Sequence, residues 1–192
     1  MENKNNNTLK IYALPSFFIE KDNFDDYKYE STDINKIVKK VSKNKGYNLR
    51  INPDEPCIVY GDLDKTTLIQ FEEFLKFLCY YFEVTIDEIS YSSSKNNTSF
   101  HYSIPSIKTN PKNLKAIFEQ KAFDKFKLDL SVYTTHWFRL PGQTLEGKPE
   151  PHIIIKGIPE DFIINYTDKV ESELEEFQPT LYKFLFLHCI NL

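Results

Sequence analysis

Short apolar runs separated by polar turns occupy the middle of the chain, and they predict a fold rich in strands. The run Cys57-Ile58-Val59-Tyr60 follows Pro53 and Pro56 and predicts a short buried strand. Pro15 interrupts an apolar stretch at 11–19, so any strand there is short or lies at a sheet edge. Further strands are predicted at 86–93, 99–104, 137–142, 152–156 and 162–166.

Residues 99–104 alternate strictly between polar and apolar side chains. Ser99, His101 and Ser103 fall on one face of the predicted strand, and the intervening residues give it an apolar face. Together with 86–93 and the polar turn 94–98, this pattern predicts a hairpin. A lone histidine is usually a surface residue or a hydrogen-bonded core residue. Its place between two hydroxyl residues in mid-strand favours a position facing a site.

Helical periodicity is clearest after residue 66. Thr67 and Gln70 have the spacing of a capping box. The apolar stripe behind them predicts a helix through Phe82 and consists of Leu68, Phe71, Leu75, Leu78, Cys79 and Phe82. Asn110-Pro111 predicts a second helix start, followed by a buried stripe of Leu114, Ile117 and Phe118. Further helices are predicted at 34–41 and beginning at 171–176. Together with the predicted strands, they indicate an α/β (α+β) fold class.

Composition and charge narrow the function classes. A chain of 192 residues suits one domain, or two small lobes that share a core, and we assign 1–192 to a single domain. A net charge of −4 excludes a globally basic nucleic-acid binder. No apolar stretch predicts a membrane span, and we expect no membrane partner. Cys57, Cys79 and Cys189 lack zinc-ligand spacing and favour a reducing, intracellular compartment.

Two carboxylates follow the first buried strand, in Tyr60-Gly61-Asp62-Leu63-Asp64-Lys65. Because side chains alternate along a strand, Asp62 and Asp64 point to one side. Their mutual repulsion is relieved if a hard cation such as Mg²⁺ or Mn²⁺ lies between them. The alternative is a polar turn that joins a strand to a helix, where aspartate is common. Asp129, which lies between apolar residues in Leu128-Asp129-Leu130, is placed as a third carboxylate entering from a sheet would be.

The order of these motifs resembles the archaeo-eukaryotic primase superfamily, in particular primase-polymerases and the primase domains of large DNA viruses' helicase-primases. The matching stretches are Ile58–Asp64, Ser99-Phe100-His101, and Asp129–Thr134 leading to Phe138-Arg139-Leu140, within about residues 56–150. The resemblance implies a small α/β lobe packed on an RRM-like lobe, with the active site in the cleft between them. It implies template-dependent nucleotidyl transfer by a two-metal mechanism, with release of pyrophosphate.

The resemblance also implies roles for individual residues. Asp62, Asp64 and Asp129 would be the catalytic ligands of two Mg²⁺ or Mn²⁺ ions. The remaining residues would bind the incoming nucleotide: Ser99 and His101 at its phosphates, Arg139 and Lys148 at its triphosphate, with His136 and Lys95 as further candidates.

The implied partners are a single-stranded DNA template, a primer strand and nucleoside triphosphates, with a helicase on the same chain or in the same complex. The implied compartment is the cytoplasm or nucleus, including a viral replication site in the host. Two other functions remain open. One is a nucleotide- or RNA-binding module of the same fold without catalysis, and the other is a metal-dependent nuclease.

Overall fold

The computed structural model describes residues 9–13, 29–32, 47–134, 136–142, 151–165, 167 and 169–174. These residues form a mixed α+β fold, as the sequence predicts. One sheet has five strands, β4 (Cys57–Asp64), β5 (Ser90–Ser93), β6 (Ser99–Thr109), β8 (Ile153–Lys156) and β9 (Ser172–Glu173). The other has four strands, β1 (Leu9–Ala13), β2 (Tyr29–Thr32), β3 (Tyr47–Ile51) and β7 (His136–Arg139). The described α-helices are α2 (Leu68–Phe82) and α3 (Pro111–Phe118).

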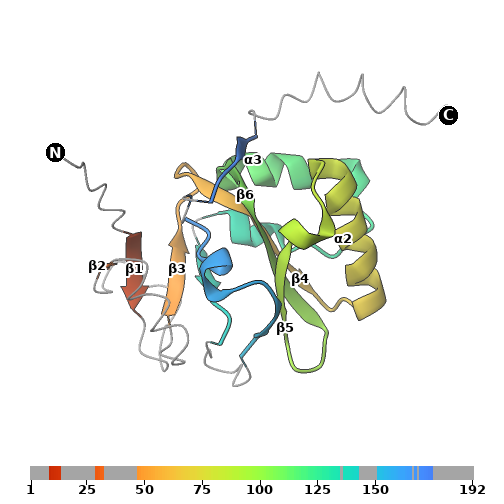
Figure 1. Ribbon diagram of the computed structural model, residues 1–192, viewed down its shortest axis with the longest axis horizontal. Coiled ribbons are helices and arrows are strands. Elements are labelled where there is room, and N and C mark those ends of the chain that lie inside the picture. Colours follow the sequence, from red (N-terminus) through yellow and green to blue (C-terminus); the bar gives the residue numbers. More distant parts are fainter. Residues whose placement is uncertain are drawn as a thin grey trace.

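The two sheets and α2 lie in successive layers (Figure 1). The five-stranded sheet has the order β4-β6-β5-β8, with antiparallel neighbours, and β9 runs parallel to the far end of β6. The four-stranded sheet has the order β2-β1-β3-β7 and is antiparallel. The register between β4 and β6 shifts between Ile58 and Val59 and is regular from there to Asp64. The predicted hairpin is confirmed as β5 and β6.

The two faces of the five-stranded sheet pack against different partners. On the apolar face, the Phe100 ring stacks on Phe71 of α2 at a centroid distance of 4.1 Å. On the polar face, Phe138 of β7 packs against His101, with their ring centroids 4.8 Å apart. It also meets Tyr60 at 5.2 Å. The part of the polar face around Tyr60 and His101 is therefore buried against β7.

Both predicted helix starts are confirmed. The Thr67 hydroxyl accepts the backbone N–H of Gln70, and the Gln70 side chain accepts the backbone N–H of Thr67, which completes the capping box. Asn110 caps α3 by accepting the backbone N–H of Asn113 at 2.7 Å. The predicted stripe of α2 is right except at its first residue, because Leu68 is 44% exposed. No helix in the described part of the chain has the length and apolar character needed to cross a membrane.

The strand predicted at 86–93 is confirmed only over β5, and two other predicted elements are wrong. Residues 86–88 form a 3₁₀ turn, η2 (Ile86–Glu88), because the Glu88 carboxylate accepts from Thr85. The strand predicted at 162–166 is wrong over its described residues, because η5 (Pro159–Phe162), where the Asp161 carboxylate accepts the Ile158 N–H, ends at 162, and 163–165 form no strand. The predicted helix from 171 begins instead with β9, which pairs with β6. The predicted helix at 34–41 lies outside the described residues.

Candidate functional site

Two motifs of the sequence are joined by the pairing of β4 with β6. Asp62 lies opposite His101, and Asp64 lies opposite Ser99. Residues opposite one another in an antiparallel pair share a face, so all four side chains lie on the polar face. His101 Nε2 is 3.6 Å from Asp62 Oδ2, and both side chains are largely buried. The strand β4 continues through Asp64, so the alternative of a polar turn at these aspartates is wrong.

Asp129 is held beside β4 by its backbone. Its N–H donates to the carbonyl oxygen of Asp62 at 2.9 Å, and Leu128 forms an isolated bridge with Leu63. Asp129 then begins the 3₁₀ helix η4 (Leu130–Tyr133), because one oxygen of its carboxylate accepts the Ser131 N–H at 2.9 Å. The third predicted acid therefore reaches the sheet through a single bridge, and its side chain caps the turn.

Two tyrosines fix η4 against β4. The Tyr60 hydroxyl donates to the Val132 carbonyl, and the Tyr133 hydroxyl donates to the Tyr60 carbonyl, both at 2.8 Å. Burial raises the pKa of both hydroxyls well above the ordinary tyrosine value, so both remain protonated donors. Gly61 lets the rings come this close, since a Cβ there would lie 2.5 Å from the Tyr133 hydroxyl oxygen. This clamp sets the position of Asp129 relative to Asp62.

Arg139 approaches the acids from the other sheet. It is 8% exposed and lies on β7, next to Phe138, which contacts His101. Burial lowers the pKa of its guanidinium, while the charges of Asp62 and Asp64 oppose that shift. An arginine nevertheless stays protonated in proteins. The site therefore contains a permanent cation facing two carboxylates across the interface between the sheets.

Several polar atoms of this site are buried and have no hydrogen-bond partner among the described residues. They are Asp62 Oδ1, Ser92 Oγ, His101 Nδ1 and Arg139 Nη1. Buried polar atoms in native proteins are normally hydrogen-bonded, so unpaired ones that gather in one place indicate a ligand site. Here an unused carboxylate oxygen and an unused guanidinium nitrogen offer one contact for a cation and one for an anion.

The other predicted residues are only partly brought to this site. Lys95 is exposed in the turn between β5 and β6. The backbone of His136 pairs with Ile51 in β7, but its side chain lies outside the description. Lys148 lies outside the described residues. Within the described ranges, no group of three or more His, Cys, Asp or Glu side chains is close enough to hold one metal ion.

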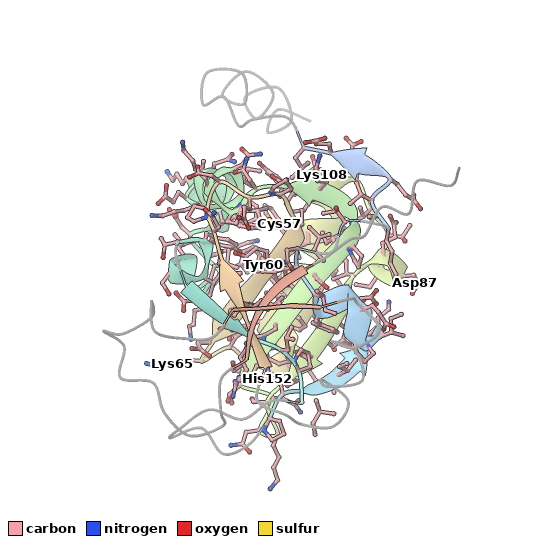
Figure 2. The ribbon with its side chains drawn as sticks, turned by 90° about the vertical axis from the view of Figure 1, so that its left-hand side faces the viewer. Cys57, Tyr60, Lys65, Asp87, Lys108 and His152 are labelled. Carbon is pink, nitrogen blue, oxygen red and sulfur yellow. The ribbon has the colours of Figure 1, made fainter. Side chains whose placement is uncertain are left out.

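Sequence reasoning missed His152. It is 2% exposed, and its ring centroid is 4.1 Å from that of His101. Its carbonyl oxygen accepts the Gly142 N–H at 2.8 Å. Figure 2 shows Tyr60 and His152 in the middle of the molecule and Lys65 at its edge. The only indication in the sequence was that the apolar strand predicted at 152–156 begins with a histidine.

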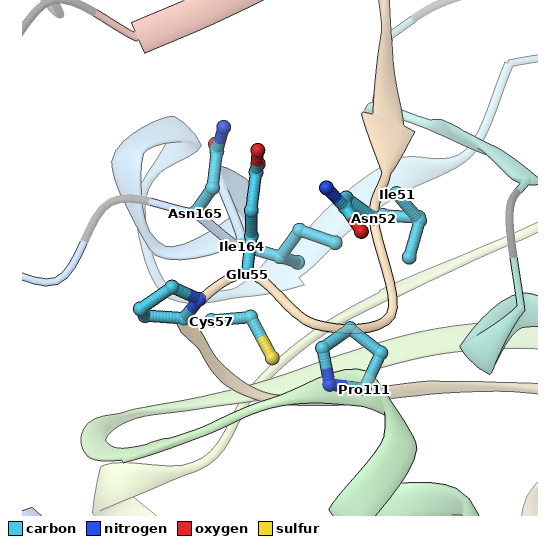
Figure 3. A pocket seen from close by; sticks show the side chains of 8 residues that line it. Ile51, Asn52, Glu55, Cys57, Pro111, Ile164 and Asn165 are labelled. Atoms are coloured by element: carbon cyan, nitrogen blue, oxygen red, sulfur yellow. The ribbon is translucent and has the colours of Figure 1, made fainter.

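A separate, shallow hollow lies at the opposite end of β4 and opens to solvent (Figure 3). It is lined by Ile51, Asn52, Glu55, Pro56, Cys57, Pro111, Ile164 and Asn165. Burial raises the pKa of the Cys57 thiol far above its ordinary value, which makes it a poor nucleophile. We therefore assign no chemistry to this hollow.

The site proper thus consists of Asp62 and Asp64 from β4, Ser99 and His101 from β6, and Arg139 from β7, with Asp129 beside them. Its members come from both sheets and from distant parts of the chain. No model of a known protein family matches the sequence, and none of the curated proteins matches it either.

Proposed function

We propose that this chain is a template-dependent nucleotidyltransferase of the primase-polymerase type, which joins nucleotides and releases pyrophosphate. The observation that carries the proposal is the convergence of Asp62, His101 and Arg139 between the two sheets, with an unpaired buried polar atom on Asp62 and another on Arg139. Nucleotidyl transfer requires oxygen ligands for cations and cationic donors for phosphate at one place. This site offers both.

The proposal includes the two-lobed architecture of primase-polymerases. We take the five-stranded sheet as the RRM-like lobe, since α2 covers one of its faces and leaves the other to the site. The four-stranded sheet would belong to the smaller lobe, and it supplies Arg139. The packing of Phe138 against Tyr60 and His101 supports an active site between the lobes.

The carboxylates suit the proposed Mg²⁺ or Mn²⁺ ions. Asp62 offers a buried oxygen with no hydrogen-bond partner, and Asp64 points to the same face of β4. Asp129 would contribute through the oxygen that does not accept from Ser131. The chemistry that two such ions supply when bound is activation of the attacking 3′-hydroxyl and neutralisation of charge on the leaving pyrophosphate.

The chain's own cationic and hydroxyl groups would bind and orient the nucleotide. Arg139 would donate from Nη1 to a phosphate oxygen, and its burial would make this charge-assisted hydrogen bond stronger than one in water. His101 and Ser99 would contact the phosphates from the neighbouring strand β6. The template and primer strands, the nucleoside triphosphate and an attached helicase belong to the proposal as its partners.

The first test measures incorporation of labelled nucleotides on a primed single-stranded template with Mg²⁺ or Mn²⁺. Asp62→Ala, Asp64→Ala and Asp129→Ala should each abolish incorporation, while Asp124→Ala, at an exposed aspartate, should not. Loss of one crowded carboxylate relieves like-charge repulsion, so the metal-free variants should remain folded. Near-normal incorporation by any of the three would remove that residue from the proposed metal site.

A second test separates nucleotide binding from template binding. Arg139→Met should reduce incorporation by about 10²- to 10³-fold, as loss of one charge-stabilising donor does. Template affinity, measured by fluorescence anisotropy, should remain unchanged. Parallel loss of both properties would contradict the assigned role. Shortening of the labelled strand without any extension would indicate a nuclease, and nucleotide binding without either activity would indicate a binding module.

A further inference from the structure

Ser92 and His101 lie side by side on the polar face. They are opposite one another in the pairing of β5 with β6, and Asp62 is opposite His101 on the next strand. The three side chains therefore form a row across three strands. Ser92 is fully buried and His101 is 4% exposed. Side chains of directly opposite residues have their Cβ atoms about 5 Å apart, so the serine hydroxyl is within reach of the imidazole.

The unused atoms of this pair are complementary. His101 turns Nε2 toward a carboxylate oxygen of Asp62, and an ionised carboxylate can only accept a hydrogen bond. A neutral imidazole that carries its hydrogen on Nε2 has a lone pair on Nδ1, which must accept. Nδ1 has no partner in the described structure, and neither does the hydroxyl of Ser92. A hydroxyl can donate, and a step between staggered rotamers redirects it.

We propose that Ser92 is the positioning residue of His101: its hydroxyl donates to Nδ1 and holds the ring with its hydrogen on Nε2. One hydrogen bond then satisfies two buried polar atoms. The ring would present a donor toward Asp62 and toward a phosphate bound beside it. The effect of Ser92 on catalysis rests on the proposed function, whereas its effect on the ring does not.

His152 is the rival partner for the same nitrogen. Its ring centroid is 4.1 Å from that of His101, and it is also buried. An imidazole could supply a donor to Nδ1 as a hydroxyl does. Ser93 provides a matched control, because it is the next residue, is also buried, and hydrogen-bonds Ser94 and Asn97 in the hairpin turn instead.

The experiment is a long-range ¹H–¹⁵N correlation spectrum of the full chain, labelled with ¹⁵N-histidine and freed of metal by EDTA. At about pH 9 imidazole is neutral, and the two tautomers give distinct nitrogen shifts. His101→Gln identifies the signals of His101. The wild type should show hydrogen on Nε2 and an Nδ1 shift typical of a hydrogen-bonded acceptor. Ser92→Ala should move Nδ1 downfield to the value of a free acceptor or produce both tautomers, and Ser93→Ala should change neither.

Unchanged His101 signals in Ser92→Ala would overturn the proposal, and so would a wild-type ring with its hydrogen on Nδ1. The same change in His152→Phe, with none in Ser92→Ala, would assign the role to His152. In the incorporation assay, Ser92→Ala should lower kcat about 10-fold, as loss of a supporting hydrogen bond typically does. If the wild type shows the predicted spectrum but incorporates no nucleotide, the positioning role stands and the proposed function fails.

Discussion

Gly61→Ala tests whether the contact between β4 and η4 depends on the absence of a side chain. A Cβ at this position would lie 2.5 Å from the Tyr133 hydroxyl oxygen and 2.6 Å from both the Cε1 atom and the hydroxyl oxygen of Tyr102. Contacts this short cannot persist, and both rings are fully or almost fully buried. One ring must move, or β4 must bend away at the residue before Asp62.

The expected cost has two parts. Overpacking a tight core typically costs about 1–3 kcal/mol. If Tyr133 moves, its hydrogen bond to the Tyr60 carbonyl is lost as well, which costs about 1 kcal/mol. Gly61→Ala should therefore lower the free energy of unfolding by about 2–4 kcal/mol, measured by urea denaturation with circular dichroism. If β4 bends beside Asp62 instead, incorporation should also fall at temperatures where the variant is still folded.

A double-mutant cycle with Tyr133→Phe tests the cause. The single change Tyr133→Phe removes the atom nearest to the new methyl group and should cost about 1 kcal/mol by itself. In the double variant the costs should not add, because the methyl group gains the space of the hydroxyl. Strict additivity, or a cost of Gly61→Ala below about 0.5 kcal/mol, would refute the steric argument, since surface-like substitutions fall in that range.

Three further predictions concern stability and reactivity. Asp161→Ala should cost about 1–3 kcal/mol in urea denaturation, because it leaves the buried Ser90 hydroxyl without its acceptor and removes the acceptor of the Ile158 N–H; a cost under about 0.5 kcal/mol would contradict this. Thr67→Ala should cost about 1 kcal/mol by loss of the α2 cap, and an unchanged urea midpoint would show that the capping box contributes nothing. Iodoacetamide at pH 8 should leave Cys57 unmodified in the native protein, because burial raises the pKa of its thiol; mass spectrometry that finds rapid modification would contradict its burial.

Local sequence patterns were sufficient for the elements that carry the acids. The apolar run at 57–60 and the aspartates that follow it predicted both the buried strand and the shared face of Asp62 and Asp64. The alternation at 99–104 likewise placed His101 on the polar face of a hairpin. These features depend on the period of a strand and on turn chemistry, which neighbouring residues determine.

The approach of the second sheet could not be predicted in this way. Arg139 reaches the acids because β7 pairs with β3, where its partner is Asn48 in a distant part of the chain, and no local pattern encodes that pairing. His152 likewise reaches His101 because the strand that follows it, β8, pairs with β5 from an earlier part of the chain. Ser172 and Glu173 are strongly polar and resemble a helix start, yet backbone hydrogen bonds to the end of β6 hold them as β9. Tertiary contacts outweigh local propensity at such positions.

The register shift between Ile58 and Val59 divides β4 and β6 into two parts that respond differently to changes in chain length. Ile58 pairs with Lys108, whereas Val59 pairs with Ile104, so residues 105–107 lie between the two registers. Insertions or deletions at that irregularity change a region whose pairing is already irregular, so the pairing from Val59 to Asp64 can stay as it is. One residue lost between Val59 and Asp62 would instead rotate both aspartates onto the face that packs against α2. The positions of the two acids therefore depend on each other, because a single in-frame deletion before Asp62 removes both carboxylates from the site.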